Sequence, residues 1–185
     1  EKTHVPRLQK GEDQKETTHV CAIDNAGNCV SMTHSLGMPS GVVTEGLGFV
    51  YNGCMGVFDP RPGKTGSLAP GKSRFTSMAP SMIFKDGKPM LLIGAPGGTY
   101  IAMGVVQGIL NVLDFGMDAE KAVAAPRFSA TSDIIEIVNR IPHFVQEELE
   151  AQDGLAAAVH LSHIEHVRTW CSLIPPDLQF TWGGG

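Results

Sequence analysis

The stretch from residue 81 to residue 113 restricts the possible folds most, because its pattern changes from strand to helix across a glycine cluster. Two runs of β-type residues, at 81–84 and 90–93, flank Lys85-Asp86-Gly87-Lys88, which is typical of a tight turn. The cluster Gly94-Ala95-Pro96-Gly97-Gly98 follows and leads into a helical pattern over residues 99–113. The apolar residues on one face of that helix are Ile101, Val105, Ile109 and Val112. The sequence therefore predicts a hairpin whose second strand turns directly into a helix.

A second hairpin is predicted earlier in the chain. Its β-type runs, at 19–24 and 29–35, are separated by Asp24-Asn25-Ala26-Gly27-Asn28, a strong turn sequence. Residues 37–75 are rich in glycine and proline, which predicts a long surface loop interrupted by one short strand at 49–51. Loops of this length usually serve a binding or catalytic site.

Shorter elements are expected after residue 113. Asp118 is expected to cap a helix that runs to Ala124 and is stopped by Pro126. A strand is expected at 134–138, and a helix opened by proline at 142–151. Antiparallel hairpins with helices packed on a face predict an α+β layered fold.

Three regions of the chain differ in character. Residues 1–16 are polar and charged and are expected to form an exposed linker before the first strand. Residues 17–152 hold the predicted elements. Residues 153–185 show no closing strand pattern, which favours the hypothesis of a truncated or frameshifted ending. The tail histidines at 160, 163 and 166 recur every third residue, so on a helix they would drift apart rather than converge on a metal.

Composition argues against several classes of function. The formal net charge is −5 and no Lys/Arg run stands out, which disfavours nucleic-acid binding. No stretch of about eighteen apolar residues occurs, so no membrane-spanning helix is predicted. Residues 1–16 have no signal-peptide pattern, and the cellular compartment is left open. The four cysteines form no C-x-x-C pair, and neither a metal nor a cofactor is predicted.

Thr17 lies where the charged segment meets the first predicted strand. A threonine hydroxyl becomes a good nucleophile when a base takes its proton, and cleavage of the preceding peptide bond frees an α-amine that can serve as that base. The pKa of an α-amine, about 8 in model compounds, suits general-base work near neutrality. Cleavage between Glu16 and Thr17 would place the nucleophile at the start of a rigid strand. The alternative is a threonine selected for β-propensity alone.

Two further segments carry groups suited to acyl transfer. Pro96-Gly97-Gly98 lies between a strand and a helix, where backbone N–H groups and the helix N-terminus can stabilise an oxyanion. A tight strand-to-helix turn is the alternative explanation. Thr76 and Ser77 are adjacent hydroxyls at the exit of the long loop and can bind a substrate carboxylate. Alternatively, these hydroxyls bond the backbone of a turn.

Taken together, these segments resemble the small subunit of gamma-glutamyltranspeptidase in order and spacing over about residues 16–150. The resemblance implies the αββα sandwich of N-terminal-nucleophile hydrolases, of which this chain would supply the catalytic half. It also implies self-cleavage before a nucleophilic threonine, followed by an acyl-enzyme that passes to water or to an amine. The motifs that carry it are Thr17-Thr18-His19, Asp24 with Gly27-Asn28, Ser77-Met78-Ala79-Pro80, Lys85-Asp86-Gly87-Lys88, Gly94-Ala95-Pro96-Gly97-Gly98 and Ala125-Pro126-Arg127-Phe128.

The resemblance also implies roles for individual residues. Thr17 matches the nucleophile, and Thr33 matches a threonine that supports the nucleophile's amine and helps self-cleavage. Ser35 falls where the family has another hydroxyl near the substrate. Thr76 and Ser77 match the hydroxyl pair that binds the substrate α-carboxylate, and the glycines of the oxyanion hole correspond to Gly97 and Gly98.

Three positions depart from the pattern of gamma-glutamyl enzymes. Cys54 and Val57 replace an amide and an acid that hold the substrate's α-ammonium, and Gly37 stands where asparagine is frequent. An apolar group cannot pair with an ammonium, and an unpaired buried charge costs several kcal/mol.

The leading hypothesis is therefore a gamma-glutamyltransferase or glutathione hydrolase-like enzyme that acts on small amides such as gamma-glutamyl compounds. Its expected partner is a large subunit from the same precursor. The alternatives are an acylase for dicarboxylic acyl-amides or oxamate-type substrates, and an unprocessed, inactive fragment.

Overall fold

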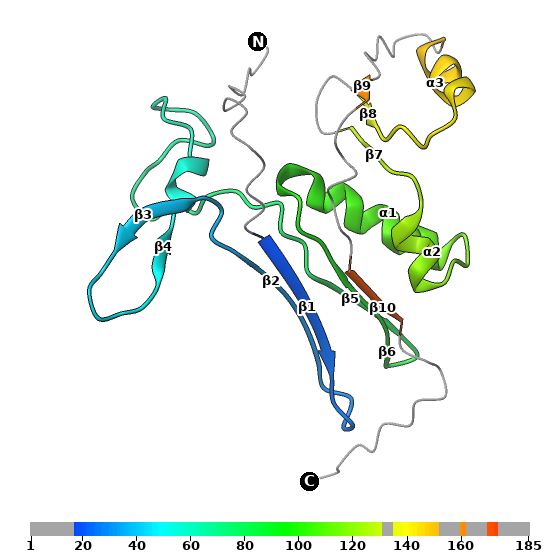
Figure 1. Cartoon of the computed structure of the whole chain (residues 1–185), viewed down its shortest axis with the longest axis horizontal. Coiled ribbons are helices and arrows are strands. Elements are labelled where there is room, and N and C mark those ends of the chain that lie inside the picture. The colour runs from blue at the N-terminus through cyan, green and yellow to red at the C-terminus, as the bar shows by residue number, and fades with distance from the viewer. Residues whose placement is uncertain (1–16, 131–134, 152–159, 162–169, 174–185) are drawn as a thin grey trace.

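The structure is a computed structural model that describes residues 17–130, 135–151, 160–161 and 170–173 (Figure 1). Its elements are β1 (Thr17–Ile23), β2 (Cys29–Ser35), β3 (Pro39–Val43), β4 (Val50–Asn52), the 3-10 helix η1 (Cys54–Val57), β5 (Ser81–Lys85), β6 (Lys88–Gly94), the 3-10 helix η2 (Gly98–Tyr100), α1 (Ile101–Leu113), α2 (Ala119–Ala124), β7 (Phe128–Ser129), β8 (Glu136–Ile137), α3 (His143–Glu150), β9 (His160–Leu161) and β10 (Trp170–Leu173). The mixture of antiparallel hairpins and helices agrees with the predicted α+β class.

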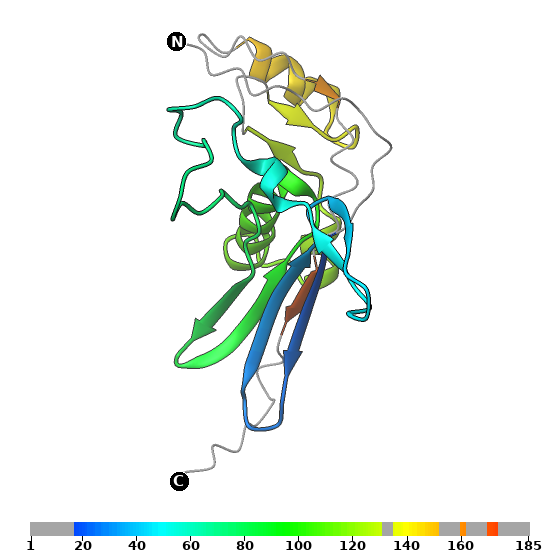
Figure 2. The ribbon, with the colours of Figure 1, turned by 90° about the vertical axis from the view of Figure 1, so that its left-hand side faces the viewer.

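Three layers are stacked in the part that holds the site. The sheet β10-β6-β5 has helices α1 and α2 on one face and the hairpin β1-β2 on the other (Figures 1 and 2). Strand β6 is the centre of this arrangement because it pairs antiparallel with β5 and with β10. The end of β6 therefore lies between the hairpin and the start of α1.

The hairpin β1-β2 forms as its sequence predicts. Its register pairs Thr17 with Ser35 at the open end and Ile23 with Cys29 next to the turn. The Asp24 carboxylate stabilises the turn by accepting hydrogen bonds from the backbone N–H groups of Ala26 and Asn28, both at 2.9 Å. This local side-chain bonding fixes the register of the whole hairpin, and with it the pairing at residue 17.

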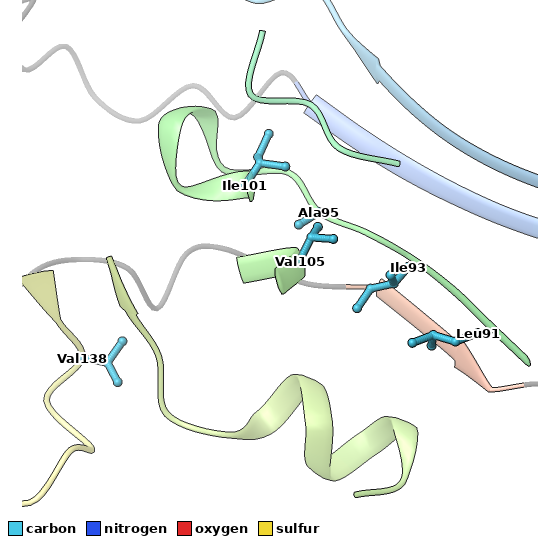
Figure 3. Packing of buried hydrophobic residues seen from close by; sticks show 6 residues of the cluster. All are labelled: Leu91, Ile93, Ala95, Ile101, Val105 and Val138. Carbon is cyan, nitrogen blue, oxygen red and sulfur yellow. The ribbon is translucent and has the colours of Figure 1, made fainter. Parts of the chain in front are cut away.

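Strand β6 is buried on both faces. Leu91 and Ile93 alternate with Leu92 and Gly94, and all four are buried. The first two pack toward α1 in a cluster that Figure 3 shows from close by. Because strand side chains alternate, Leu92 and Gly94 face the hairpin layer instead. The residues of the cluster are Leu91, Ile93, Ala95, Ile101, Val105 and Val138.

The tail contributes a strand that its sequence did not predict. The expectation of no closing strand beyond Gln152 was wrong, because Trp170–Leu173 pairs antiparallel with Leu91–Gly94. The second edge of a buried strand needs hydrogen-bond partners, and β10 supplies them. Such long-range pairing leaves no mark in the local pattern of the tail. His160 likewise lies in a strand, parallel to β8, whereas His163 and His166 lie outside the described residues.

The glycine-rich region contains more structure than predicted. Strand β3 pairs with β4 across a register shift, and Gly41 lies within β3 with a φ of 74°. The expected strand at 49–51 is confirmed as β4, but β3 was missed because glycine and proline interrupt its pattern. Further along, Asp59 and Ser67 form an isolated bridge, and the guanidinium of Arg61 lowers the pKa of Asp59 to about 2.

The helices largely follow the sequence. Asp118 caps α2 by accepting a hydrogen bond from the Lys121 backbone N–H at 2.8 Å, as predicted. Helix α1 begins at Ile101 rather than at residue 99, because η2 occupies the first turn. Pro142 is the N-cap of α3. Within the described ranges, no helix has the length and apolar character that a membrane crossing requires.

Candidate active site

Thr17 is the first residue of β1, and its side chain meets that of Ser35. The two hydroxyl oxygens lie 2.8 Å apart, and both residues are half-buried. The Ser35 oxygen also accepts a hydrogen bond from the Gly37 backbone N–H at 2.9 Å. Because either hydroxyl can donate in the Thr17–Ser35 bond, Ser35 can orient the Thr17 oxygen without fixing the position of its proton.

Thr33 lies on the same face of β2 as Ser35, two residues earlier, and its hydroxyl does not bond Thr17. Its hydroxyl is 2.9 Å from Nδ1 of His19, its partner in the register. The hydroxyl that contacts the predicted nucleophile is therefore that of Ser35, whereas the Thr33 hydroxyl bonds His19. Glu16, the other half of the predicted cleavage site, lies outside the described residues.

His19 is a buried polar residue of β1, two positions after Thr17, and its sequence pattern did not predict a role for it. Its side chain is on the same face of β1 as Thr17, and Nε2 lies 3.1 Å from Sγ of Cys21 and 3.5 Å from Oγ of Ser31. The ring also rests directly on Gly94. Period-two alternation places His19 beside Thr17, and the run of polar residues at that period in β1 and β2 was the available signal.

Burial lowers the pKa of His19 from its ordinary value. The unfolded chain therefore binds a proton at His19 more tightly than the folded chain does. This difference lowers the free energy of unfolding as the pH falls through about 6.5, and it has no effect well above that pH. We therefore expect the thermal midpoint of the wild type to fall more steeply from about pH 7 to about pH 5 than that of His19→Asn. Calorimetry in matched buffers measures both slopes, and equal slopes would show that His19 is not held neutral.

Gly97 and Gly98 occupy the turn from β6 to α1. Their φ angles are 142° and 59°, a region that L side chains rarely adopt. The tight strand-to-helix turn, one of the two expected features, is present, and Gly98 within it is exposed. The Gly97 carbonyl accepts a hydrogen bond from Tyr100.

The predicted hydroxyl pair lies next to this turn. The Ser77 hydroxyl donates to the carbonyl of Gly98, which brings two predicted groups together. The Thr76 hydroxyl accepts a hydrogen bond from the Met78 backbone N–H at 3.2 Å. Both hydroxyls therefore take part in backbone hydrogen bonds here, the alternative that the sequence left open.

The hydrogen bonds thus join the predicted residues in two separate pairs, Thr17 with Ser35 and Ser77 with Gly98. The layers that carry these pairs are in contact, since β1 and β2 pack on β6, which ends just before Gly97. Among the described residues, no group of three or more His, Cys, Asp or Glu side chains is arranged to hold a metal ion.

Two of the three departures lie side by side: Gly37, just after β2, and Cys54, the first residue of η1. A Cβ added to Gly37 would lie 3.1 Å from Sγ of Cys54, so these two positions share one small space. The Cys54 thiol donates weakly to the Leu36 carbonyl at 3.6 Å. Val57 is the last residue of the 3-10 helix η1, which Cys54 begins, and it is half-buried. This corner, which begins two residues after Ser35, carries a thiol and a valine.

Sequence comparison identifies the family. The sequence model described as Gamma-glutamyltranspeptidase matches residues 1–169. The chain belongs to the gamma-glutamyltranspeptidase family. The match includes part of the tail that the sequence analysis had treated as atypical.

The curated relatives include acylases and glutathione hydrolases. The chain is 40% identical over 144 residues to the Acylase ACY 1 proenzyme of Pseudomonas sp. (strain V22), covering 77% of this chain and 26% of the relative. It is 38% identical over 133 residues to the Glutathione hydrolase proenzyme of Pseudomonas aeruginosa, covering 65% of this chain and 24% of the relative. The chain thus spans about a quarter of the length of these curated relatives.

Solved structures confirm the fold. Gamma-glutamyltranspeptidase from Pseudomonas nitroreducens, complexed with L-DON, matches with a TM-score of 0.74 and 31% identity, covering 86% of this chain and 90% of that chain. Cephalosporin acylase from Bacillus halodurans matches with a TM-score of 0.70 and 27% identity, covering 82% of this chain and 28% of that chain. The predicted catalytic half of an N-terminal-nucleophile αββα sandwich is confirmed at the level of fold.

Proposed function

We propose that this chain is the catalytic part of a self-cleaving amidohydrolase or acyltransferase whose nucleophile is Thr17. The observation that supports this most is the 2.8 Å contact between the Thr17 and Ser35 hydroxyls at the start of β1. Thr17 is half-buried and begins a strand held in register by a complete hairpin. A nucleophile needs such a rigid support.

Maturation uses the same hydroxyl. The Thr17 oxygen attacks the carbonyl carbon of Glu16, the C–N bond to Thr17 breaks, and the acyl group moves from nitrogen to oxygen. Water then hydrolyses this ester, which leaves a carboxylate on Glu16 and a free α-amine on Thr17. Ser35 orients the attacking oxygen through its hydrogen bond. The chain needs no other nucleophile for this step.

Turnover reuses the freed amine. The α-amine of Thr17 takes the proton from its own hydroxyl, and the oxygen attacks the amide carbon of the substrate. The proton passes to the leaving amine, and an ester between the acyl group and Thr17 remains. Water or an acceptor amine then releases the acyl group. The backbone N–H groups of the Gly97–Gly98 turn stabilise the oxyanion in both steps.

The partner we propose is the large subunit of the same precursor. The outer face of the hairpin is unusually apolar and open, with Val20, Val30 and Met32 each about half exposed at 46%, 51% and 50%. An αββα sandwich needs a further helical layer on such a face. The proenzyme names of the relatives support a precursor that is cut into subunits.

Gamma-glutamyl amides are the first substrate class we propose. The hydroxyls of Thr76 and Ser77 lie next to the Gly98 turn, where they can take the α-carboxylate of a gamma-glutamyl group once their backbone bonds are exchanged. The glutathione hydrolases among the relatives support this class.

One specific observation favours a second candidate, an acylase for dicarboxylic acyl groups without an α-ammonium. The corner formed by Gly37, Cys54 and Val57 offers no charged side chain to pair with an ammonium. An ammonium in such a place would lose its hydration without compensation. The acylase relatives support this candidate.

A substitution at this corner separates the two classes. We expect Val57→Asp to raise kcat/KM for gamma-glutamyl-p-nitroanilide by about tenfold relative to glutaryl-p-nitroanilide, because the new carboxylate pairs with the ammonium that only the first compound has. Release of p-nitroaniline by the mature protein measures both rates. Val57→Asn is the matched control, since it adds a polar group of the same size without charge.

The wild-type ratio of the two rates decides between the classes. A strong preference for the gamma-glutamyl compound supports the first class, and a preference for the glutaryl compound supports the second. An equal gain for both compounds in Val57→Asp would show that this corner does not face the substrate's ammonium position.

A further inference from the structure

His19 connects the two layers that carry the proposed catalytic groups. On the hairpin side, Nδ1 of His19 is bonded to the Thr33 hydroxyl at 2.9 Å. On the sheet side, the ring lies so close to Gly94 that an added Cβ would come within 2.2 Å of Cε1 and 2.3 Å of Nδ1. The residue is only 5% exposed. His19 is therefore enclosed between β1-β2 and the end of β6.

The position of His19 along the chain links it to both catalytic elements. It is the next same-face residue after Thr17 in β1, and the Thr17–Ser35 and His19–Thr33 pairs are neighbours in one register. Gly94 is the last residue of β6, and the Gly97–Gly98 turn follows three residues later. Displacement of the ring would therefore shift Thr17 relative to the turn. A shift of about 1 Å at such a distance from the chemistry can lower a rate about a hundredfold.

We infer that His19 is a positioning residue that sets the separation between the Thr17 strand and the Gly97–Gly98 turn through its contacts with Thr33 and Gly94. The inference rests on the proposed function, because it assigns Thr17 and the turn to one reaction. His19 does not touch the reacting atoms in this account; it acts through the two strands that it holds.

The hydrogen bonds of the ring support this role. A neutral imidazole has one donor and one acceptor nitrogen. Both nitrogens have neighbours from the hairpin: Thr33 at Nδ1, and Cys21 and Ser31 at Nε2. Ser31 in turn donates to the Ile93 carbonyl at 3.4 Å, so the network extends into β6 itself. The ring orientation is thus fixed on both sides.

The test uses the precursor that contains this chain, in which self-cleavage before residue 17 and later turnover can both be followed. His19→Leu replaces the ring by an apolar side chain of similar size and removes both nitrogens. His19→Asn instead provides a polar side chain that can bond Thr33. His34→Leu is the matched control, because His34 lies on the exposed opposite face of β2. Rates are compared at a temperature where melting curves show every variant folded.

We expect His19→Leu to slow self-cleavage by about tenfold or more and to lower kcat with KM unchanged, because the substrate contacts are intact but the reacting groups are misplaced. His19→Asn recovers part of both losses, and His34→Leu cleaves at the wild-type rate. A merely structural role would lower the melting temperature and leave these rates of the folded protein unchanged.

Two results overturn the inference. If folded His19→Leu cleaves and turns over at the wild-type rates, the positioning role of His19 is wrong and the proposed function stands. If the wild-type precursor stays whole, the positioning role and the proposed function are both wrong. If His19→Leu does not fold, Thr33→Val decides, since it removes the hydrogen bond to Nδ1 and keeps the side-chain shape. Cleavage of Thr33→Val or of Gly94→Ala at the wild-type rate then overturns the inference, whereas slower cleavage in both variants supports it, because the added methyl group of Gly94→Ala displaces the ring itself.

Discussion

Replacing Thr17 by alanine is expected to abolish turnover of amide substrates, with kcat falling by about four orders of magnitude or more. The reason is that Thr17 supplies both the attacking oxygen and, after cleavage, the base that activates it. Ser35 cannot substitute for it, because Ser35 lies inside the chain and has no free α-amine that could act as the base. Release of p-nitroaniline from an acyl-p-nitroanilide measures the loss.

A serine at the same position is the matched variant. Thr17→Ser keeps the hydroxyl and removes only the methyl group, so measurable turnover is expected to remain. The alanine variant should also keep the fold, because Thr17 lies at the open end of the hairpin and outside the buried cluster of Figure 3. Wild-type turnover in a folded Thr17→Ala protein would assign the chemistry to another residue.

Gly94→Ala is expected to destabilise the protein by about 3 kcal/mol or more in the free energy of unfolding. The new methyl group would lie 2.2 Å from Cε1 of His19, which is far inside van der Waals contact. The ring cannot move aside easily, because it is buried and both of its nitrogens have close polar neighbours. Chemical denaturation of the mature protein, followed by circular dichroism, measures the change.

Two controls define the cause of that loss. Gly66→Ala places its methyl group 3.5 Å from the Asp59 side chain, an ordinary contact, and should change stability by less than about 1 kcal/mol. In the double variant Gly94→Ala with His19→Ala, the methyl group enters the space that the ring leaves, so the two effects should not add. Strict additivity would show that the clash with His19 is not the cause.

Much of the fold was predictable because its elements are specified locally. The turn at Asp24 bonds its own backbone, the turn between β5 and β6 has Asp86 and Gly87 at positive φ, and Asp118 caps its own helix. Each of these is a short-range effect that a sequence pattern records. By contrast, β10 was missed because its pairing with β6 depends on residues far away in the chain.

The candidate site also contains one contact that local sequence predicts and one that it does not. The pairing of Thr17 with Ser35 follows from the hairpin register, which the turn at Asp24 sets. The contact of His19 with Gly94 was not predictable, since it joins two layers through a ring and a missing side chain. A glycine in a buried strand suggests a close approach, but the partner that approaches is known only from the structure.

The most direct test of the central claim is the intact mass of the precursor and its products after incubation at neutral pH. The account predicts a new chain whose N-terminus is Thr17 in the wild type, and an uncut precursor in Thr17→Ala. N-terminal sequencing confirms the position of the cut. A wild-type precursor that stays whole, or a cut that persists in Thr17→Ala, would contradict the assignment of Thr17 as the self-cleaving nucleophile.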